Sequence, residues 1–87
     1  MEFAHSKLFK KQFQKLPPGV RQAAETRIEL FKREEFHPLL NNHKLKEEFE
    51  GYRSINVTGD YRIIFKKETE FLVRLEQIGT HPQLYGK

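Results

Sequence analysis

The chain has 87 residues and a mass of 10.4 kDa, with 16 Lys and Arg against 12 Asp and Glu, a formal net charge of +4 and an isoelectric point near 9.5. This length suits one small domain, residues 1–87, and the absence of cysteine excludes disulfides, thiolate metal sites and cysteine nucleophiles. Because the first residues form no signal sequence and apolar runs are short, we expect a soluble, cytoplasmic protein with no membrane partner.

The positive charge is concentrated at the start of the chain. Residues 1–21 hold five Lys and Arg but only one acidic residue. Clustered basic side chains attract phosphate groups, so this distribution favours a polyanionic partner such as a nucleic acid.

Two helices are predicted in the first part of the chain. Ser6 is a good N-cap, and apolar residues recur at helical spacing from Lys7 to Leu16. Pro17 and Pro18 must end this helix, and they open a second amphipathic helix from Gly19 to about Phe36. The pair predicts a helical hairpin, followed by a connecting loop over residues 37–42.

After the loop, apolar residues recur with a period of two, which is typical of strands. The pattern predicts a short strand from Leu45 to Phe49, ending at Gly51. Further strands are expected over residues 52–58, 61–66 and 71–76, with a turn at Gly59 and Asp60 and an end to the last strand at residues 79–82. Residues 2–5 are expected to form a strand at the sheet edge.

The register of the central hairpin follows from its apolar residues. A two-residue turn would mismatch the apolar faces, so we expect Val57 opposite Tyr61 and Ile55 opposite Ile63. The other face would then be polar and basic, formed by Ser54, Asn56, Arg62 and Ile64. The predicted fold class is α+β, with two N-terminal helices packed on one face of a small antiparallel β-sheet.

The sequence offers no metal or cofactor motif. The four histidines include no pair four residues apart and no acid partner at helical reach, so no metal site is predicted. No glycine-rich phosphate loop and no nucleophile elbow are present. We therefore expect no cofactor.

Several polar residues fall at the ends of predicted elements, and these could converge. They are His43, Asp60 and His81, with Asn56 and Arg62 on the polar face of the sheet. Imidazoles pass protons near neutral pH, and an arginine can hold a phosphate, which suits metal-free cleavage of RNA through its 2′-OH. Asp60 also fits an ordinary turn and Arg62 an ordinary cross-strand charge, so the residues alone leave the function open.

Three segments carry a family resemblance: residues 43–46, residues 51–65 (Gly-Tyr-Arg-Ser-Ile-Asn-Val-Thr-Gly-Asp-Tyr-Arg-Ile-Ile-Phe) and residues 78–85 (Ile-Gly-Thr-His-Pro-Gln-Leu-Tyr). They resemble the RelE/ParE toxin superfamily, most closely its YafQ-like branch. The resemblance implies a RelE-like fold and a toxin of a type II toxin–antitoxin system. Such a toxin is an mRNA endoribonuclease that acts on the ribosome without a metal, inhibits translation, and is held inactive in a hetero-oligomer with a cognate antitoxin.

The resemblance also implies roles for individual residues. His43, Asp60 and His81 match the family's proton-transfer residues, and Arg62 matches an arginine for the scissile phosphate. RNA contacts are expected from Lys46, Arg53, Asn56, Tyr61 and Tyr85. The chain departs from the pattern at Asn56, where YafQ-like toxins tend to have a histidine, at Tyr61, where some have tryptophan, and at Gln77, where some have a basic residue.

Two other functions are compatible with the same fold. One is a toxin without nuclease activity that acts on DNA gyrase or another protein, and the other is a basic RNA-binding module. Toxins of the gyrase type lack the histidine and aspartate set, so His43 and His81 favour the nuclease.

Overall fold

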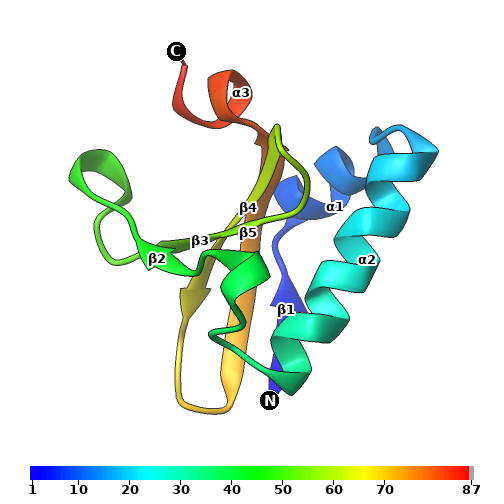
Figure 1. Cartoon of the computed structure of the whole chain (residues 1–87). Helices are drawn as coiled ribbons and strands as arrows, with labels where there is room; N and C mark the ends of the chain where they lie inside the picture. The colour runs from blue at the N-terminus through cyan, green and yellow to red at the C-terminus, as the bar shows by residue number, and fades with distance from the viewer. Residues whose placement is uncertain (87) are drawn as a thin grey trace.

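The computed structural model describes residues 1–86 and shows five strands with two helices packed on one face (Figure 1). The strand order in the sheet is β1-β5-β4-β3-β2. Among residues 1–86, no helix combines the length and apolar character needed to cross a bilayer. The elements are β1 Glu2–His5, α1 Lys7–Gln14, α2 Pro18–Arg33, β2 His43–Lys44, β3 Arg53–Asn56, β4 Tyr61–Lys67, β5 Leu72–Thr80 and α3 His81–Tyr85, with two short 3₁₀ helices, η1 Pro38–Leu40 and η2 Glu47–Phe49.

The predicted α+β class is confirmed, with one difference in the sheet. The N-terminal strand β1 does join the sheet edge, but it runs parallel to β5, with Glu2 opposite Leu72 and His5 opposite Leu75. The other neighbouring strands are antiparallel, so the sheet is mixed. Helices α1 and α2 carry the chain over one face of the sheet, from β1 at one edge to β2 at the opposite edge.

The two predicted helices form, and both end earlier than expected. The hydroxyl of Ser6 accepts a hydrogen bond from the Phe9 amide at 2.9 Å, as an N-cap does, and α1 ends at Gln14. Helix α2 ends at Arg33 because Glu34 has an extended backbone (φ −149°, ψ 90°). Phe36 is 64% exposed, so a further helical turn would gain no stabilisation from burying this side chain in the core.

The central hairpin has the predicted register. Ile55 lies opposite Ile63, and the Val57 amide donates to the Tyr61 carbonyl at 2.9 Å across a three-residue turn. Apolar side chains of this hairpin therefore face the helices. The core beneath α2 contains fully buried Phe31, Ile55, Ile63, Phe65 and Leu75.

The last strand is longer than predicted, because it contains a β-bulge. Ile64 lies opposite Gln77 and Phe65 opposite Leu75, so Glu76 is the extra residue. The bulge restores the apolar face after Leu75, and Ile78 consequently joins the same core. The Ser6 hydroxyl donates to the Glu76 carbonyl at 2.7 Å and ties the bulge to the start of α1.

Three expectations about the second half of the chain are wrong. The predicted strand at residues 45–49 is instead the 3₁₀ helix η2, because Glu47 has a left-handed backbone (φ 57°). The predicted polar face is partly covered, since Ser54 and Ile64 are buried. Phe71, at the expected start of the last strand, is 72% exposed and lies outside β5. In Figure 1, η2 and α3 lie on the opposite side of the sheet from α1 and α2.

Candidate functional site

A cleft of about 330 Å³ lies where the β3–β4 turn meets the end of β5. The antiparallel pairing of β4 with β5 puts Tyr61 opposite Thr80 and Arg62 opposite Gly79, so the turn and the C-terminal segment become neighbours. Three residues predicted from the sequence meet in this cleft. It is lined by Gly59, Asp60, Arg62, Thr80, His81 and Pro82.

The short helix α3 holds His81 at the cleft. The Thr80 hydroxyl accepts from the Gln83 amide at 3.3 Å, while the Gln83 side chain accepts from the Thr80 amide at 2.8 Å, which forms a capping box. Gly79 allows α3 to fold back on β5, because a Cβ there would lie 2.9 Å from Gln83 Oε1. The His81 ring packs against the Tyr85 ring, with centroids 4.5 Å apart.

Removal of the helix cap is expected to weaken this support. Thr80→Ala would leave the Gln83 amide without its side-chain acceptor, at a cost of about 1 kcal/mol. We expect a lower urea midpoint of unfolding with an unchanged slope. Thr80→Ser keeps the hydroxyl and is the matched control, so equal losses in both variants would contradict the role of the cap.

The β3–β4 turn presents Asp60 and Arg62 from a braced loop. The Thr58 hydroxyl accepts from the amides of Asp60 and Tyr61 at 3.2 and 3.1 Å. Arg62 Nη1 donates to the carbonyls of Thr58, Gly59 and Tyr61 at 2.8, 3.1 and 3.0 Å. Within residues 1–86 the remaining guanidinium nitrogens form no hydrogen bond, so they are available to an anion.

Asn56 adds an unused acceptor next to Arg62. It lies opposite Arg62 across the β3–β4 pair, on the same face of the sheet. Among residues 1–86, its Oδ1 is buried and has no hydrogen-bond partner. A buried acceptor left unpaired costs about 1–3 kcal/mol, and because this oxygen is closed off from the surface it gives a ligand no direct contact.

A second, smaller cleft adjoins the first and shares His81 with it. It has a volume of about 210 Å³ and is lined by Lys46, Glu47, Glu48, Phe49, His81 and Tyr85. Lys46 and Tyr85 were predicted from the sequence, whereas Phe49 was interpreted as a strand anchor. In the sequence, Phe49 lies between Lys46 and Gly51, and nothing else there distinguishes it from a core residue.

Three of the predicted site residues lie elsewhere. His43 is exposed on the edge strand β2, where its Nδ1 lies 2.7 Å from the Asn41 carbonyl, and it lines neither cleft. Arg53 lies opposite Phe65 on the helix side, and its Nε donates to Asn42 Oδ1 at 2.8 Å. Tyr61 packs against the core on that same side.

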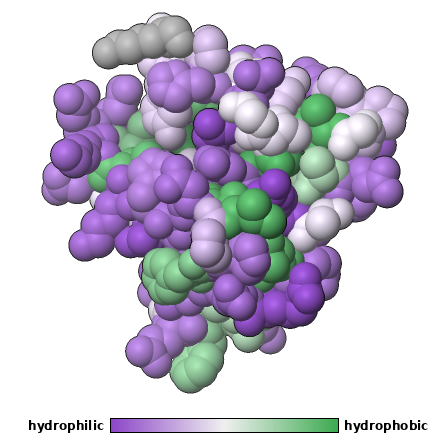
Figure 2. Space-filling model, in the orientation of Figure 1, coloured by the Kyte–Doolittle hydropathy of each residue, from purple (hydrophilic) through white to green (hydrophobic). Residues whose placement is uncertain are grey.

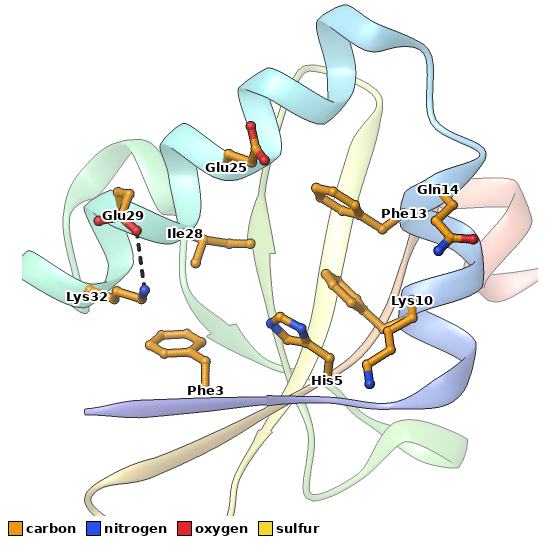
Figure 3. A pocket seen from close by; sticks show the side chains of 10 residues that line it. Phe3, His5, Lys10, Phe13, Gln14, Glu25, Ile28, Glu29 and Lys32 are labelled. Carbon is orange, nitrogen blue, oxygen red and sulfur yellow. Dashed lines mark hydrogen bonds and ion pairs between the residues drawn. The ribbon is translucent and has the colours of Figure 1, made fainter.

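Another cavity, of about 530 Å³, lies between β1, α1 and α2, on the other side of the sheet (Figure 3). Phe3, Phe13 and Ile28 give it apolar walls, and the ring of His5 points into it. Burial lowers the pKa of His5, and the charges of Lys10 and Lys32 lower it further. None of the predicted site residues lines this cavity.

The lowered pKa of His5 predicts a loss of stability in mild acid. Between the ordinary value of about 6.5 and the lower folded value, the unfolded chain binds more protons than the folded chain, so the free energy of unfolding falls as the pH falls. We expect the melting temperature to drop more between pH 7.5 and pH 5.5 in the wild type than in His5→Gln. Equal drops would contradict the prediction.

Figure 2 shows a face that is largely hydrophilic, with small apolar patches separated from one another. Within residues 1–86, no three His, Asp or Glu side chains gather in a way that would hold a metal ion. The two clefts that share His81 are therefore the candidate site.

A family model and a curated relative found by comparison with known proteins agree with each other. The family model described as "Bacterial toxin of type II toxin-antitoxin system, YafQ" matches residues 1–86. The mRNA interferase toxin YafQ of Escherichia coli (strain B / BL21-DE3) is 40% identical over 45 residues, which are 52% of this chain and 48% of that protein. The match thus spans about half the length of the curated relative.

Solved structures show the same fold. The crystal structure of YafQ from E. coli strain BL21(DE3) matches with a TM-score of 0.83 at 24% identity, covering 98% of each chain. The E. coli DinJ-YafQ toxin-antitoxin complex gives 0.80 at 24% identity, covering 98% of this chain and 97% of that chain. RelE in the RelB-RelE complex from Methanococcus jannaschii gives 0.74 at 19% identity, with 95% of each chain covered. The expected RelE-like fold is confirmed.

Proposed function

The chain belongs to the YafQ family of bacterial toxins of type II toxin–antitoxin systems, and we propose that it is an endoribonuclease that cuts mRNA on the ribosome without a metal. One observation carries the proposal. His81, Asp60 and Arg62 come from two segments about 20 residues apart and line one cleft on the face that the helices leave open. These are the residue types that RNA cleavage through the 2′-OH requires.

The chemistry assigns one task to each group. The 2′-hydroxyl loses its proton and its oxygen attacks the adjacent phosphorus, while the bond from phosphorus to the 5′ oxygen breaks and that oxygen takes up a proton. His81 and Asp60 are the proton-transfer groups within the cleft. Arg62, with guanidinium nitrogens still free within residues 1–86, binds the scissile phosphate and stabilises the charge that develops on it.

Further RNA contacts extend from this centre. Lys46 and Tyr85 line the adjoining cleft, and Asn56 lies opposite Arg62 on the same face of the sheet. His43 lies on the same sheet face as Ser54, its partner across β2 and β3. Because it is at the sheet edge, we assign His43 to the flanking RNA or to proton transfer after a shift of β2.

The same family membership leads us to propose a protein partner. The related E. coli YafQ is found in a complex with DinJ, and RelE of M. jannaschii in a complex with RelB. We propose that this chain forms a hetero-oligomer with a cognate antitoxin. The antitoxin would block RNA from the two clefts that share His81. Co-expression with the antitoxin should relieve growth arrest and yield a complex on size-exclusion chromatography.

The test of the activity is induced expression in a bacterial host with primer extension on a reporter mRNA. The same mRNA with its start codon destroyed is the control. Breaks only in the translated message would support a ribosome-dependent nuclease. Growth arrest without breaks would favour DNA gyrase or another protein as the target, and binding without breaks or arrest would favour an RNA-binding module.

The chemistry of the cut ends tests the metal-free route. Attack by the 2′-OH leaves a 2′,3′-cyclic phosphate and a 5′-hydroxyl, whereas attack by water with departure of the 3′ oxygen leaves a 5′-phosphate. We expect cut fragments to accept a phosphate from polynucleotide kinase without prior phosphatase treatment. A requirement for phosphatase would contradict the proposed mechanism.

A further inference from the structure

The cavity between β1, α1 and α2, named here the helix-side cavity, has the size and the walls of a small-molecule site. Its volume of about 530 Å³ lies within the roughly 300–1,000 Å³ of such sites. Phe3, Phe9, Phe13 and Ile28 form its apolar wall. The Phe3 ring meets the buried Phe31 ring edge to face at 5.4 Å, and Phe9 stacks on Phe13 at 5.8 Å. These contacts hold the wall in place, so the space is formed before a ligand binds.

His5 is the polar group that faces this apolar space. Its ring points into the cavity (Figure 3) and packs against the Phe9 ring, with centroids 5.3 Å apart. Nδ1 of His37 and Nδ1 of His43 each meet a backbone partner, whereas within residues 1–86 neither ring nitrogen of His5 forms a hydrogen bond. A neutral imidazole has one donor and one acceptor, so both remain available to a ligand.

The charges near His5 favour an anion at this end of the cavity. Lys10 of α1 lines the cavity and forms no ion pair within residues 1–86. Lys32 of α2 lies with its Nζ 5.4 Å from the centre of the Phe3 ring. Burial and then the charges of these two lysines lower the pKa of His5. A positive potential that opposes protonation of an imidazole attracts a carboxylate to the same place.

The acidic side chains of the cavity belong to α2. Glu29 pairs with Lys32 at 3.3 Å, whereas Glu25 forms no ion pair within the described part of the chain. Figure 3 shows Glu25 across the cavity from His5. An anion is therefore attracted at the end formed by His5 and Lys10 and repelled by the opposite wall, which sets the direction in which an asymmetric ligand would lie.

We propose that the helix-side cavity binds a small carboxylic acid with an apolar body. The carboxylate accepts from His5 and Lys10, and the apolar body packs against Phe3, Phe13 and Ile28. An alcohol with the same body lacks the charge, and an amine is repelled by the two lysines. The proposal does not depend on the nuclease function, because no residue of the two clefts that share His81 lines this cavity.

The first test compares three probes with the same apolar body. The purified chain is titrated with 4-phenylbutanoate, 4-phenylbutan-1-ol and 4-phenylbutan-1-amine, and the amide signals of β1, α1 and α2 are followed by NMR. We expect the acid to bind about two- to fivefold more tightly than the alcohol, the range for an exposed ion pair, and the amine to bind most weakly. An alcohol that binds as tightly as the acid would indicate a site for apolar side chains of a partner protein and would overturn the proposal.

The second test changes the charges of the cavity one at a time. Lys10→Gln should weaken binding of 4-phenylbutanoate by about two- to fivefold. Lys11→Gln is the matched control, because Lys11 is the next lysine of α1 and does not line the cavity. Glu25→Gln should strengthen binding, because it removes a like charge. Equal affinities in Lys10→Gln and Lys11→Gln would contradict the proposal.

The His5 ring reports directly on where the carboxylate lies. Four charged groups face His5 around the cavity, Lys10 on α1 and Glu25, Glu29 and Lys32 on α2, and all four are the same with and without the probe. A carboxylate beside the imidazole favours its protonated form, so saturation with 4-phenylbutanoate should raise the pKa of His5, measured from the ring proton signals. The alcohol should not raise it. An unchanged pKa of His5 with the acid bound would place the ligand elsewhere and reject the site.

Discussion

His81→Ala is expected to lower mRNA cleavage by about 10²- to 10⁴-fold, the usual contribution of a positioned proton-transfer group. The side chain is exposed at the start of α3, so its loss should leave the fold intact. The two clefts would remain, without the one imidazole that borders both. Primer extension on the translated reporter measures the loss, and relief of growth arrest accompanies it.

The matched control for this variant is His5→Gln, which replaces a histidine on the opposite side of the sheet. At pH 7.5 we expect it to cut as the wild type does. Circular dichroism of both variants confirms that folding is retained. A His81→Ala chain that folds and still cuts the same sites would show that proton transfer belongs to other groups.

Phe31→Ala is expected to lower the free energy of unfolding by about 3–5 kcal/mol. Phe31 on α2 is completely buried, and its ring contacts Phe3 at 5.4 Å and Phe65 at 4.9 Å. It therefore joins the second helix to both the edge strand and the centre of the sheet. Small domains are stable by only about 5–15 kcal/mol, so this single change should bring the chain close to unfolding.

Urea unfolding of the purified chain measures this effect. Leu8→Ala on α1 is the control, because the Leu8 side chain is 48% exposed and its loss should change stability by no more than about 0.5 kcal/mol. Similar shifts of the midpoint in the two variants would mean that burial beneath α2 is not the main source of stability.

The parts of the fold that followed from the sequence were those with long regular patterns. The apolar alternation of Ile55 and Val57 with Tyr61 and Ile63 allowed only one register, and the structure has it. The same alternation placed Arg53 on the face of Ile55, so its position on the helix side was readable as well. Arg53 was nevertheless predicted to contact RNA, and that prediction followed the family resemblance.

The remaining differences arise where local sequence is ambiguous or depends on distant contacts. The apolar spacing of Leu45 and Phe49 fits a strand, and only the left-handed backbone at Glu47 prevents one. The bulge at Glu76 depends on pairing with β4 and on the hydroxyl of Ser6, both far away in sequence. Helix α3 was not predicted, because its five residues are too few to show helical periodicity.

For the candidate site, sequence reasoning brought Asp60, Arg62 and His81 together, and they line one cleft. The expectation came from their positions at the ends of predicted elements, and their roles came from the family resemblance. The sequence did not separate His43 from these three residues. The placement of His43 on β2 depends on how the chain returns to the sheet after α2. The contact between the Phe49 and Tyr85 rings joins segments far apart in the sequence, so no local pattern predicted it.

The bulge at Glu76 divides β5 into two halves, whose registers against β4 differ by one residue. The first half, residues 72–75, pairs with β1, whereas the second half returns Ile78 to the same core and ends at Thr80, next to His81. Without the extra residue, the side chains after Leu75 would exchange faces of the sheet, so Ile78 would leave the core and the chain would enter α3 from the other face.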